Sequence, residues 1–137
     1  MFDTKIYFEK SKESFESSIL CGENKLYNSW ANRAYYSMYI LCSIILSKMG
    51  INPDGKNHQS NTCYYTHKQV TEQLNFRFRK DKKFNKLKIN RLFNDLLNNR
   101  GIADYDPNRN VDEFMYKNIK SNFKDAYLEL EGNLPRI

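Results

Sequence analysis

The sequence is poor in helix-breaking residues, with only five Gly and three Pro in 137 residues. A protein built from many short strands needs frequent tight turns, and Gly and Pro supply most of them. No strand-like alternation, internal repeat or low-complexity segment is visible. The composition therefore predicts an all-α protein with long helices rather than a many-turned β fold.

Long apolar runs are also absent. The longest, Met38 to Leu46, is far shorter than the roughly 20 residues that cross a bilayer. The first residues, Met-Phe-Asp-Thr-Lys, lack the pattern of a signal peptide. We therefore expect a cytoplasmic protein with no membrane as a partner.

Cysteine and histidine are scarce, with three Cys and two His in the chain. Cys21, Cys42 and Cys63 form an odd, widely spaced set, which favours buried free thiols in a reducing compartment. His58 and His67 have no cysteines or carboxylates at metal-ligand spacing. The sequence predicts neither a metal site nor a cofactor, and it favours a packed, hydrogen-bonded role for His67 on an apolar face.

Apolar residues make up 40% of the chain and aromatic residues 15%, enough for one sizeable core and one domain over residues 1–137. Apolar positions at helical spacing predict helices over about 4–20, 25–49, 62–78, 84–97 and 111–130, with a polar loop over 51–61. Asp3 and Asn24 suit the first two N-caps, Asn108 or Asn110 suits the last, and Gly22 suits a helix stop. We expect an antiparallel four- to five-helix bundle around the second helix, which is apolar over most of its girth.

Positive charge is concentrated in one stretch. Residues 77–100 hold nine Lys or Arg against Asp81 and Asp95, whereas the rest of the chain holds 13 basic and 14 acidic residues. Clustered positive charge attracts nucleic acid, although a solvated lysine-rich helix face would look the same. The candidate nucleic-acid-binding residues are Arg33, Arg77, Arg79, Lys82, Lys83, Lys86 and Arg91.

Arg100 continues the apolar stripe of Ile89, Leu92 and Leu96. An acidic turn, Asp104-Tyr105-Asp106-Pro107, is predicted directly after it. Burying an arginine is costly unless it has a partner or a task. The plain alternative is a cation favoured by the dipole at the end of a helix. Arg33 has a similar plain alternative, as an arginine that snorkels or stacks among tyrosines.

Two stretches together resemble the HEPN family (higher eukaryotes and prokaryotes nucleotide-binding). The stretch from Tyr27 to Tyr39, which contains Asn32-Arg33-Ala34-Tyr35-Tyr36-Ser37, is similar to the family's N-R-x-Y-Y-A stretch on its second helix. Arg100-x-x-x-Asp104-Tyr105-Asp106 is similar to the R-x-x-x-D-Y-D stretch of small stand-alone bacterial members. The loop Lys56-Asn57-His58-Gln59-Ser60 resembles the K-x-H-S-G of that subgroup. The resemblance implies a helical bundle that commonly dimerises across the helix bearing the arginine.

Many HEPN proteins are metal-independent ribonucleases of toxin–antitoxin and defence systems, with an arginine followed after four to six residues by a histidine. That pair suits a reaction in which a base activates the ribose 2′-OH and a cation holds the phosphate charge. In this chain Tyr105 stands where the histidine is expected, and no histidine follows it. Tyrosine, with a pKa of about 10, is a poor base at neutral pH.

Three functions follow from this resemblance. The first is an RNA- or nucleotide-binding homodimer that lacks the catalytic histidine and uses Arg100, helped by Arg33. The second is a ribonuclease toxin with a modified catalytic set of Arg100, Asp104 and Tyr105, so enzymatic activity stays open. The third is a non-catalytic partner of a minimal nucleotidyltransferase antitoxin, with Tyr105 as a modification target. His58 and His67 have no assigned role, because the sequence alone does not bring either close to Arg100.

Overall fold

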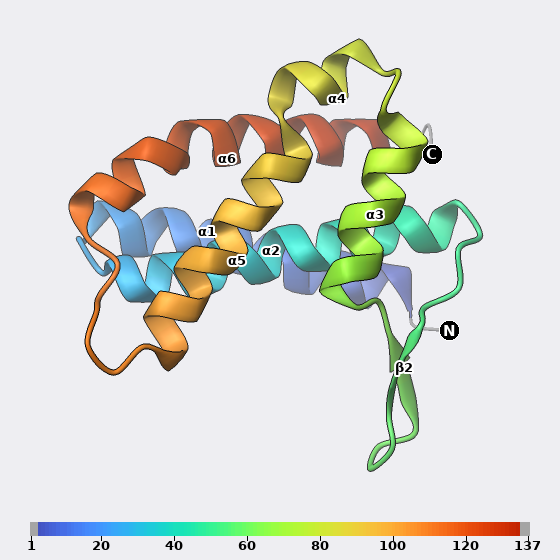
Figure 1. The fold of residues 1–137 in the computed structure, drawn as a ribbon, viewed down its shortest axis with the longest axis horizontal. Coiled ribbons are helices and arrows are strands. Elements are labelled where there is room, and N and C mark those ends of the chain that lie inside the picture. Colours follow the sequence, from blue (N-terminus) through green and yellow to red (C-terminus); the bar gives the residue numbers. More distant parts are fainter. Residues whose placement is uncertain (1–2, 135–137) are drawn as a thin grey trace.

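The computed structural model describes residues 3–134, without the side chains of Lys83, Phe84 and Leu87. The predicted all-α bundle is confirmed, with one short β-hairpin added (Figure 1). The elements are α1 (Thr4–Glu23), α2 (Tyr27–Lys48), β1 (Gly55–Asn57), β2 (Thr62–Tyr64), α3 (His67–Phe78), α4 (Lys82–Leu87), α5 (Ile89–Tyr105) and α6 (Glu113–Asn133).

Helix α2 is the centre of the bundle, as its apolar girth predicts. Twelve of its 22 residues are buried, and α1, α3, α5 and α6 all pack against it. Helices α1, α2 and α6 run lengthwise while α5 crosses them (Figure 1). Each described helix is too short or too polar to traverse a bilayer.

A buried polar link ties α1, α2 and α6 together. The Ser11 hydroxyl donates to the Ser37 carbonyl (2.7 Å) and shares a 2.8 Å hydrogen bond with the Tyr127 hydroxyl. The Tyr127 ring stacks on Phe15 with a 4.0 Å centroid separation. The link satisfies polar groups inside the core and fixes the relative rotation of the three helices.

Two predictions for the turn between α1 and α2 are wrong, namely the helix stop at Gly22 and the N-cap at Asn24. Asp3 does cap α1, accepting from the Lys5 and Ile6 backbone N–H groups, but the helix continues through Gly22 to Glu23. Gly22 is a packing position instead, since a Cβ there would lie 2.5–2.8 Å from the Tyr116 ring. Asn24 closes α1 rather than capping α2, because its backbone N–H and its side-chain amide both donate to the Leu20 carbonyl.

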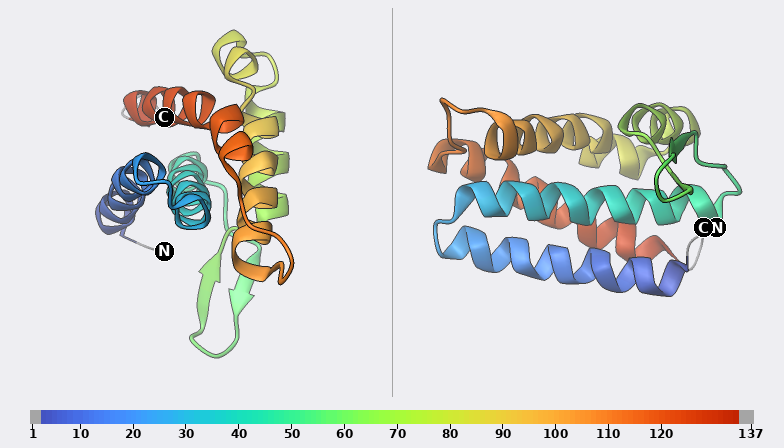
Figure 2. Two further views of the ribbon diagram at one scale, coloured as in Figure 1. Left: turned by 90° about the vertical axis from the view of Figure 1, so that its left-hand side faces the viewer. Right: turned by 90° about the horizontal axis from the view of Figure 1, so that it is seen from below.

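The helix predicted over 62–78 begins only at His67, where the Thr66 hydroxyl accepts from the Gln69 N–H. The preceding residues pair as antiparallel strands, Gly55 with Tyr64 and Asn57 with Thr62, and the hairpin extends away from the helices (Figures 1 and 2). Its strands of three residues are too short to show alternation. Cys63 is therefore exposed rather than buried, Cys21 is half-buried and Cys42 is buried; all three thiols are free.

The fourth predicted helix is divided, and its second part is longer than expected. Lys88 adopts a left-handed conformation (φ 51°) that separates α4 from α5. Helix α5 then runs to Tyr105. The turn predicted to begin at Asp104 therefore begins only after Tyr105. Asp112, not Asn108 or Asn110, caps α6 by accepting from the Met115 N–H. The consequence for the site is that Arg100 and Asp104 lie one helical turn apart on α5.

Candidate functional site

The Arg100 side chain lies between α5 and α2, surrounded by tyrosines. Its guanidinium carbon is 5.0 Å from the ring centroids of Tyr35 and Tyr36 and 5.4 Å from that of Tyr105. Its Nη2 donates to the hydroxyls of Tyr36 (3.0 Å) and Tyr105 (3.1 Å). These contacts are cation–π interactions combined with charge-assisted hydrogen bonds. The side chain is 20% exposed, so the guanidinium is held in place at the edge of the surface.

Asp104 balances the arginine charge. Its Oδ2 lies 3.4 Å from Arg100 Nε and accepts a 2.8 Å hydrogen bond from the Asn32 amide. Arg100 Nε is buried and makes no hydrogen bond among the described residues, so the contact with Asp104 is an ion pair without an aligned hydrogen bond. We call Asn32, Tyr35, Tyr36, Arg100, Asp104 and Tyr105 the Arg100 cluster.

The cluster joins two segments that are far apart in the chain. Asn32, Tyr35 and Tyr36 come from α2, and the other three members come from the C-terminal part of α5. The three residues predicted as a catalytic set, Arg100, Asp104 and Tyr105, are brought together, because the continued helix places them within five residues on α5. The tyrosines of α2 complete the site through helix packing.

Two tyrosines of the cluster differ in their surroundings. Burial raises the pKa of Tyr35 to about 12, although the charge of Arg100 acts in the opposite direction. The Tyr35 hydroxyl therefore stays protonated at neutral pH and is unsuited to act as a base. Tyr105 is 71% exposed and offers its ring and hydroxyl to solvent.

Arg33 lies beside the cluster rather than in it. It is exposed and lines a cavity of about 380 Å³ between α1 and α2, which Asn32 and Tyr36 also line. Tyr36 thus contacts Arg100 and also borders the cavity that Arg33 lines. This placement suits the predicted helper role for Arg33, since a strand of phosphates passing over Tyr36 would meet two cations.

His67 lies closer to Arg100 than the sequence indicates. Its ring stacks on Phe93 (4.6 Å between centroids, 12° between planes) and lies 6.4 Å from the ring of Tyr35, over which Arg100 sits. Its Nε2 is 3.3 Å from Asn94 Oδ1. Burial lowers the pKa of His67, with the Asn94 hydrogen bond acting against it, so the ring is neutral at neutral pH. Its Nδ1 is buried and makes no hydrogen bond among the described residues.

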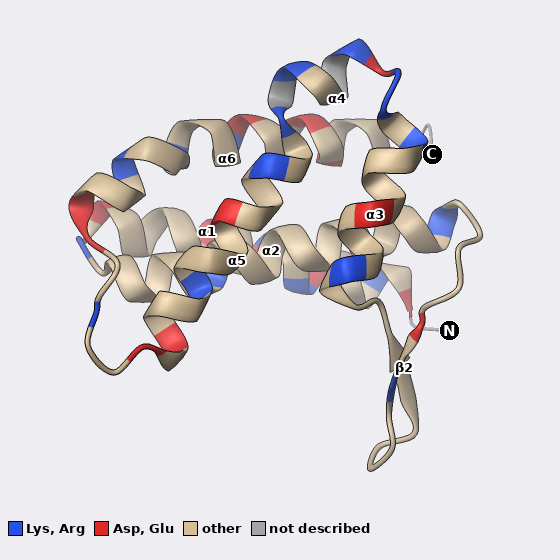
Figure 3. Ribbon diagram, in the orientation of Figure 1, with Lys and Arg blue, Asp and Glu red and all other residues tan. Residues whose placement is uncertain are grey.

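Apart from Arg33, the predicted basic residues come from α3, α4, α5 and the joints between them, where these helices meet (Figure 3). Arg77 and Arg79 flank Phe76, with guanidinium carbons 5.7 and 5.0 Å from its ring centroid. Phe76 is 58% exposed. An exposed ring between two arginines is a surface on which a nucleic-acid base can stack. The sequence reasoning missed Phe76, although its position directly before Arg77-Phe78-Arg79 was a usable signal.

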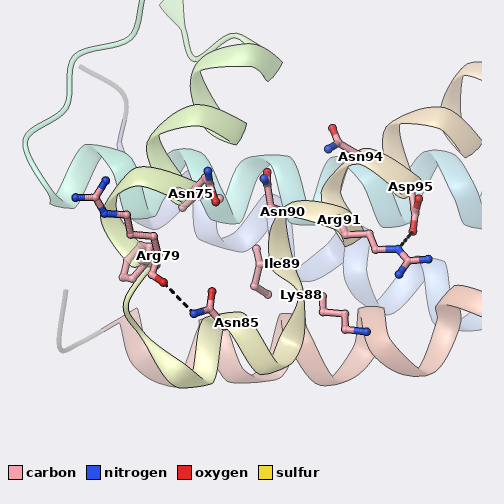
Figure 4. Close-up of a pocket in the computed structure, with 11 residues that line it drawn as sticks. Asn75, Arg79, Asn85, Lys88, Ile89, Asn90, Arg91, Asn94 and Asp95 are labelled. Carbon is pink, nitrogen blue, oxygen red and sulfur yellow. Dashed lines mark hydrogen bonds and ion pairs between the residues drawn. The ribbon is translucent and has the colours of Figure 1, made fainter.

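A cavity of about 440 Å³ lies between α3 and the start of α5 (Figure 4), and its lining includes Arg79, whose guanidinium lies over the Phe76 ring. Its polar lining consists of Asn75, Arg79, Asn85, Lys88, Asn90, Arg91, Asn94 and Asp95. Amide side chains can donate to and accept from the edges of bases. We call this cavity, together with Phe76 and Arg77, the basic corner.

The remaining predicted basic residues have different positions. Lys82 and Lys86 are exposed on α4, and the Lys83 side chain lies outside the described residues. Arg91 lines the cavity but also lies 4.0 Å from Asp95. Lys88 lines the cavity although it was not among the predicted residues, because its place depends on the left-handed joint before α5.

Among residues 3–134, no three His, Cys, Asp or Glu side chains gather closely enough to hold a metal ion. Searches against family models, curated proteins and solved structures found no match.

Proposed function

We propose that this chain is a HEPN-like, cytoplasmic RNA- or nucleotide-binding protein of a toxin–antitoxin or defence system, without the standard catalytic histidine. One observation carries the proposal. The two stretches on which the resemblance rests lie 64 residues apart, yet Tyr36 and Arg100 meet in one cluster. Residues that resemble a motif by chance have no reason to contact one another.

The surface around the cluster supports phosphate binding. Arg100 is held by aromatic rings and a carboxylate, so little side-chain freedom remains to be lost when a phosphate binds. The basic corner adds Arg77, Arg79 and Lys88 together with the exposed ring of Phe76. Cations beside an exposed aromatic ring favour single-stranded RNA, whose unpaired bases are free to stack.

The same contacts favour binding over cleavage. Asp104 Oδ2 is occupied by Asn32 and faces Arg100, and the Tyr105 hydroxyl already accepts from Arg100. The ribonuclease alternative needs one of these groups to take a proton from the ribose 2′-OH. Neither group is arranged for that task in the single chain.

A homodimer is part of the proposal. Tyr36 and Tyr105 are 37% and 71% exposed around Arg100, and aromatic residues are enriched in protein interfaces. Pairing across this surface would bring two Arg100 clusters into one groove, which is the arrangement that the resemblance implies.

The direct test is binding of a fluorescently labelled single-stranded RNA of about 12 nucleotides, followed by anisotropy. We expect binding at about 50 mM salt that weakens steeply as salt rises, since phosphate contacts release counterions. A duplex of the same sequence should bind more weakly, and the RNA should stay intact in EDTA on a denaturing gel. Absence of binding at low salt would refute the proposal, and cleavage in EDTA would restore the ribonuclease alternative.

Tyr105 supports a second candidate function, as the acceptor for a partner nucleotidyltransferase. The ring is 71% exposed, and its hydroxyl lies 3.1 Å from Arg100 Nη2. In such a reaction the phenolic oxygen attacks the α-phosphorus of a nucleoside triphosphate and an O–P bond forms. The bond to pyrophosphate breaks, and the phenolic proton passes to a base of the partner enzyme. Arg100 is placed to hold the resulting phosphate.

This candidate is tested first in the gene neighbourhood, which should encode a minimal nucleotidyltransferase. Incubation with that enzyme, a nucleoside triphosphate and Mg²⁺ should raise the intact mass by one or more nucleotidyl groups. Tyr105→Phe should abolish the increase, whereas Tyr64→Phe should not, because Tyr64 is 45% exposed but lies on the hairpin. Modification that persists in Tyr105→Phe, or a gene neighbourhood without such an enzyme, would exclude this role.

A further inference from the structure

A second, larger cavity lies on the other side of α5, between α5 and α6 and next to α4. It has a volume of about 630 Å³, within the range of small-molecule sites. Three cations and three amides line it, namely Lys86, Lys88, Arg91, Asn99, Asn118 and Asn122. The cavity shares Lys88, Arg91 and Asp95 with the basic corner, but neither the Arg100 cluster nor Phe76 lines it.

Asn99 is the unusual member of the lining. It is only 7% exposed, and its Nδ2 has no hydrogen-bond partner among the described residues. Buried amide groups are almost always paired, and an unpaired one lowers stability. Asn99 also lines the open cavity, so a ligand that reaches this shielded donor can supply the missing acceptor.

The charge around the cavity indicates what kind of ligand would do so. Of the three cations, Arg91 is paired at 4.0 Å with Asp95, which also lines the space. Lys86 and Lys88 are exposed at the rim. Two lysines without an acid beside them in the lining favour an anion, and phosphate is the common biological one.

The apolar part of the lining completes the description. Leu92 from α5 and Met115 and Ile119 from α6 are the apolar residues of the lining, against which a flat ring can pack. The cavity thus offers lysines for a phosphate, an apolar wall for a ring and a buried amide donor for an acceptor atom. A nucleotide combines these three features in one molecule.

We propose that the cavity between α5 and α6 binds a nucleotide, with its phosphate on Lys86 and Lys88 and an acceptor atom of its base or ribose on Asn99 Nδ2. The proposal rests on the proposed function only for the class of ligand, since the site itself is new. A free mononucleotide and a nucleotide within an RNA strand share this chemistry, and the experiment separates them.

The test uses AMP, adenosine and inorganic phosphate as probes of the full chain, with calorimetry and NMR. AMP should bind more tightly than adenosine or phosphate alone and should shift the Asn99 side-chain amide resonances. Asn99→Leu removes the donor and should weaken AMP binding about tenfold, a typical cost for losing one hydrogen bond. It should also raise the Tm by about 2–4 °C, because it removes an unpaired buried group.

Asn98→Leu is the matched control, because Asn98 is the neighbouring asparagine on α5 and is exposed. It should leave AMP binding unchanged. If AMP does not bind but Asn99→Leu weakens the binding of single-stranded RNA, the nucleotide comes from a strand and the site stands. AMP binding that is unchanged in Asn99→Leu overturns the proposal. An effect of Asn99→Leu on the Tm alone, with no effect on the binding of AMP or RNA, likewise overturns it.

A negative result for the cavity can be told apart from a negative result for the proposed function. RNA binding by the unmodified chain tests the proposed function without reference to Asn99. The NMR titration of the unmodified chain tests the cavity even if Asn99→Leu does not fold. A chain that binds RNA normally but shows no effect at Asn99 would retain the proposed function and lose this site.

Discussion

Replacing Arg77 and Arg79 together by glutamine is expected to weaken the binding of single-stranded RNA at least tenfold at about 50 mM salt. Both guanidinium groups lie over the exposed ring of Phe76, so the substitution removes two phosphate contacts and the support of a stacked base. Each phosphate contact on a single strand contributes about 0.7 to the slope of log affinity against log salt. The slope should therefore fall by about 1.4 in magnitude, which anisotropy at several salt concentrations will measure.

The matched control is Lys5→Gln with Lys124→Gln. It removes the same net charge from exposed positions on α1 and α6, and Lys124 borders a cavity on the α1 side of α6. We expect the control to change RNA affinity less than threefold, through general attraction alone. Equal losses in the two double variants would mean that net charge, not the basic corner, determines binding.

Arg100→Ala is expected to lower the free energy of unfolding by about 2 kcal/mol and to reduce RNA affinity at least tenfold. The stability loss follows because the substitution removes two charge-assisted hydrogen bonds and contacts with three tyrosine rings. It also leaves Asp104 without its ion-pair partner, with a side chain only 27% exposed. Urea unfolding and RNA anisotropy on the same samples, with light scattering for the number of chains, will measure these effects.

Arg100→Lys separates the charge from the shape of the guanidinium. The lysine keeps the positive charge but cannot donate through a planar fork, so we expect about half of the stability loss and most of the loss in RNA affinity. Asp104→Asn is the milder comparison, costing less than about 1 kcal/mol because the ion pair is partly exposed. An Arg100→Ala protein as stable as the unmodified chain would contradict the described cluster, and unchanged RNA affinity would remove Arg100 from the binding site.

The long helices could be predicted from the sequence because each buries one face whose apolar residues recur at helical spacing. The elements that were wrong depend on single residues. The hairpin forms around Asn57, whose side chain accepts from the Gln59 and Ser60 backbone N–H groups. The break before α5 depends on a left-handed Lys88, and lysine carries no signal for that conformation. Neither three-residue strands nor a one-residue joint alters the hydrophobic pattern.

The site could be predicted only in part, for a similar reason. Arg100, Asp104 and Tyr105 are close in sequence, so their proximity depends only on α5 continuing past the glycine. The contacts of Tyr35 and His67 depend on how α2, α3 and α5 pack, which is information that no single segment contains. Asn99 could not be predicted, because it stands out only by the hydrogen bond that its amide lacks. A sequence does not show which buried polar groups remain unpaired.

The hydrogen bonds of Arg100 Nη2 have a consequence for how the two proposed functions would influence each other. One nitrogen serves both Tyr36 on α2 and Tyr105 on α5. A phosphate that takes this donor frees the Tyr105 hydroxyl, and a nucleotidyl group on that hydroxyl brings its own phosphate to the same arginine. The modified protein would then carry a tethered competitor for RNA, so we expect modification of Tyr105 to weaken RNA binding.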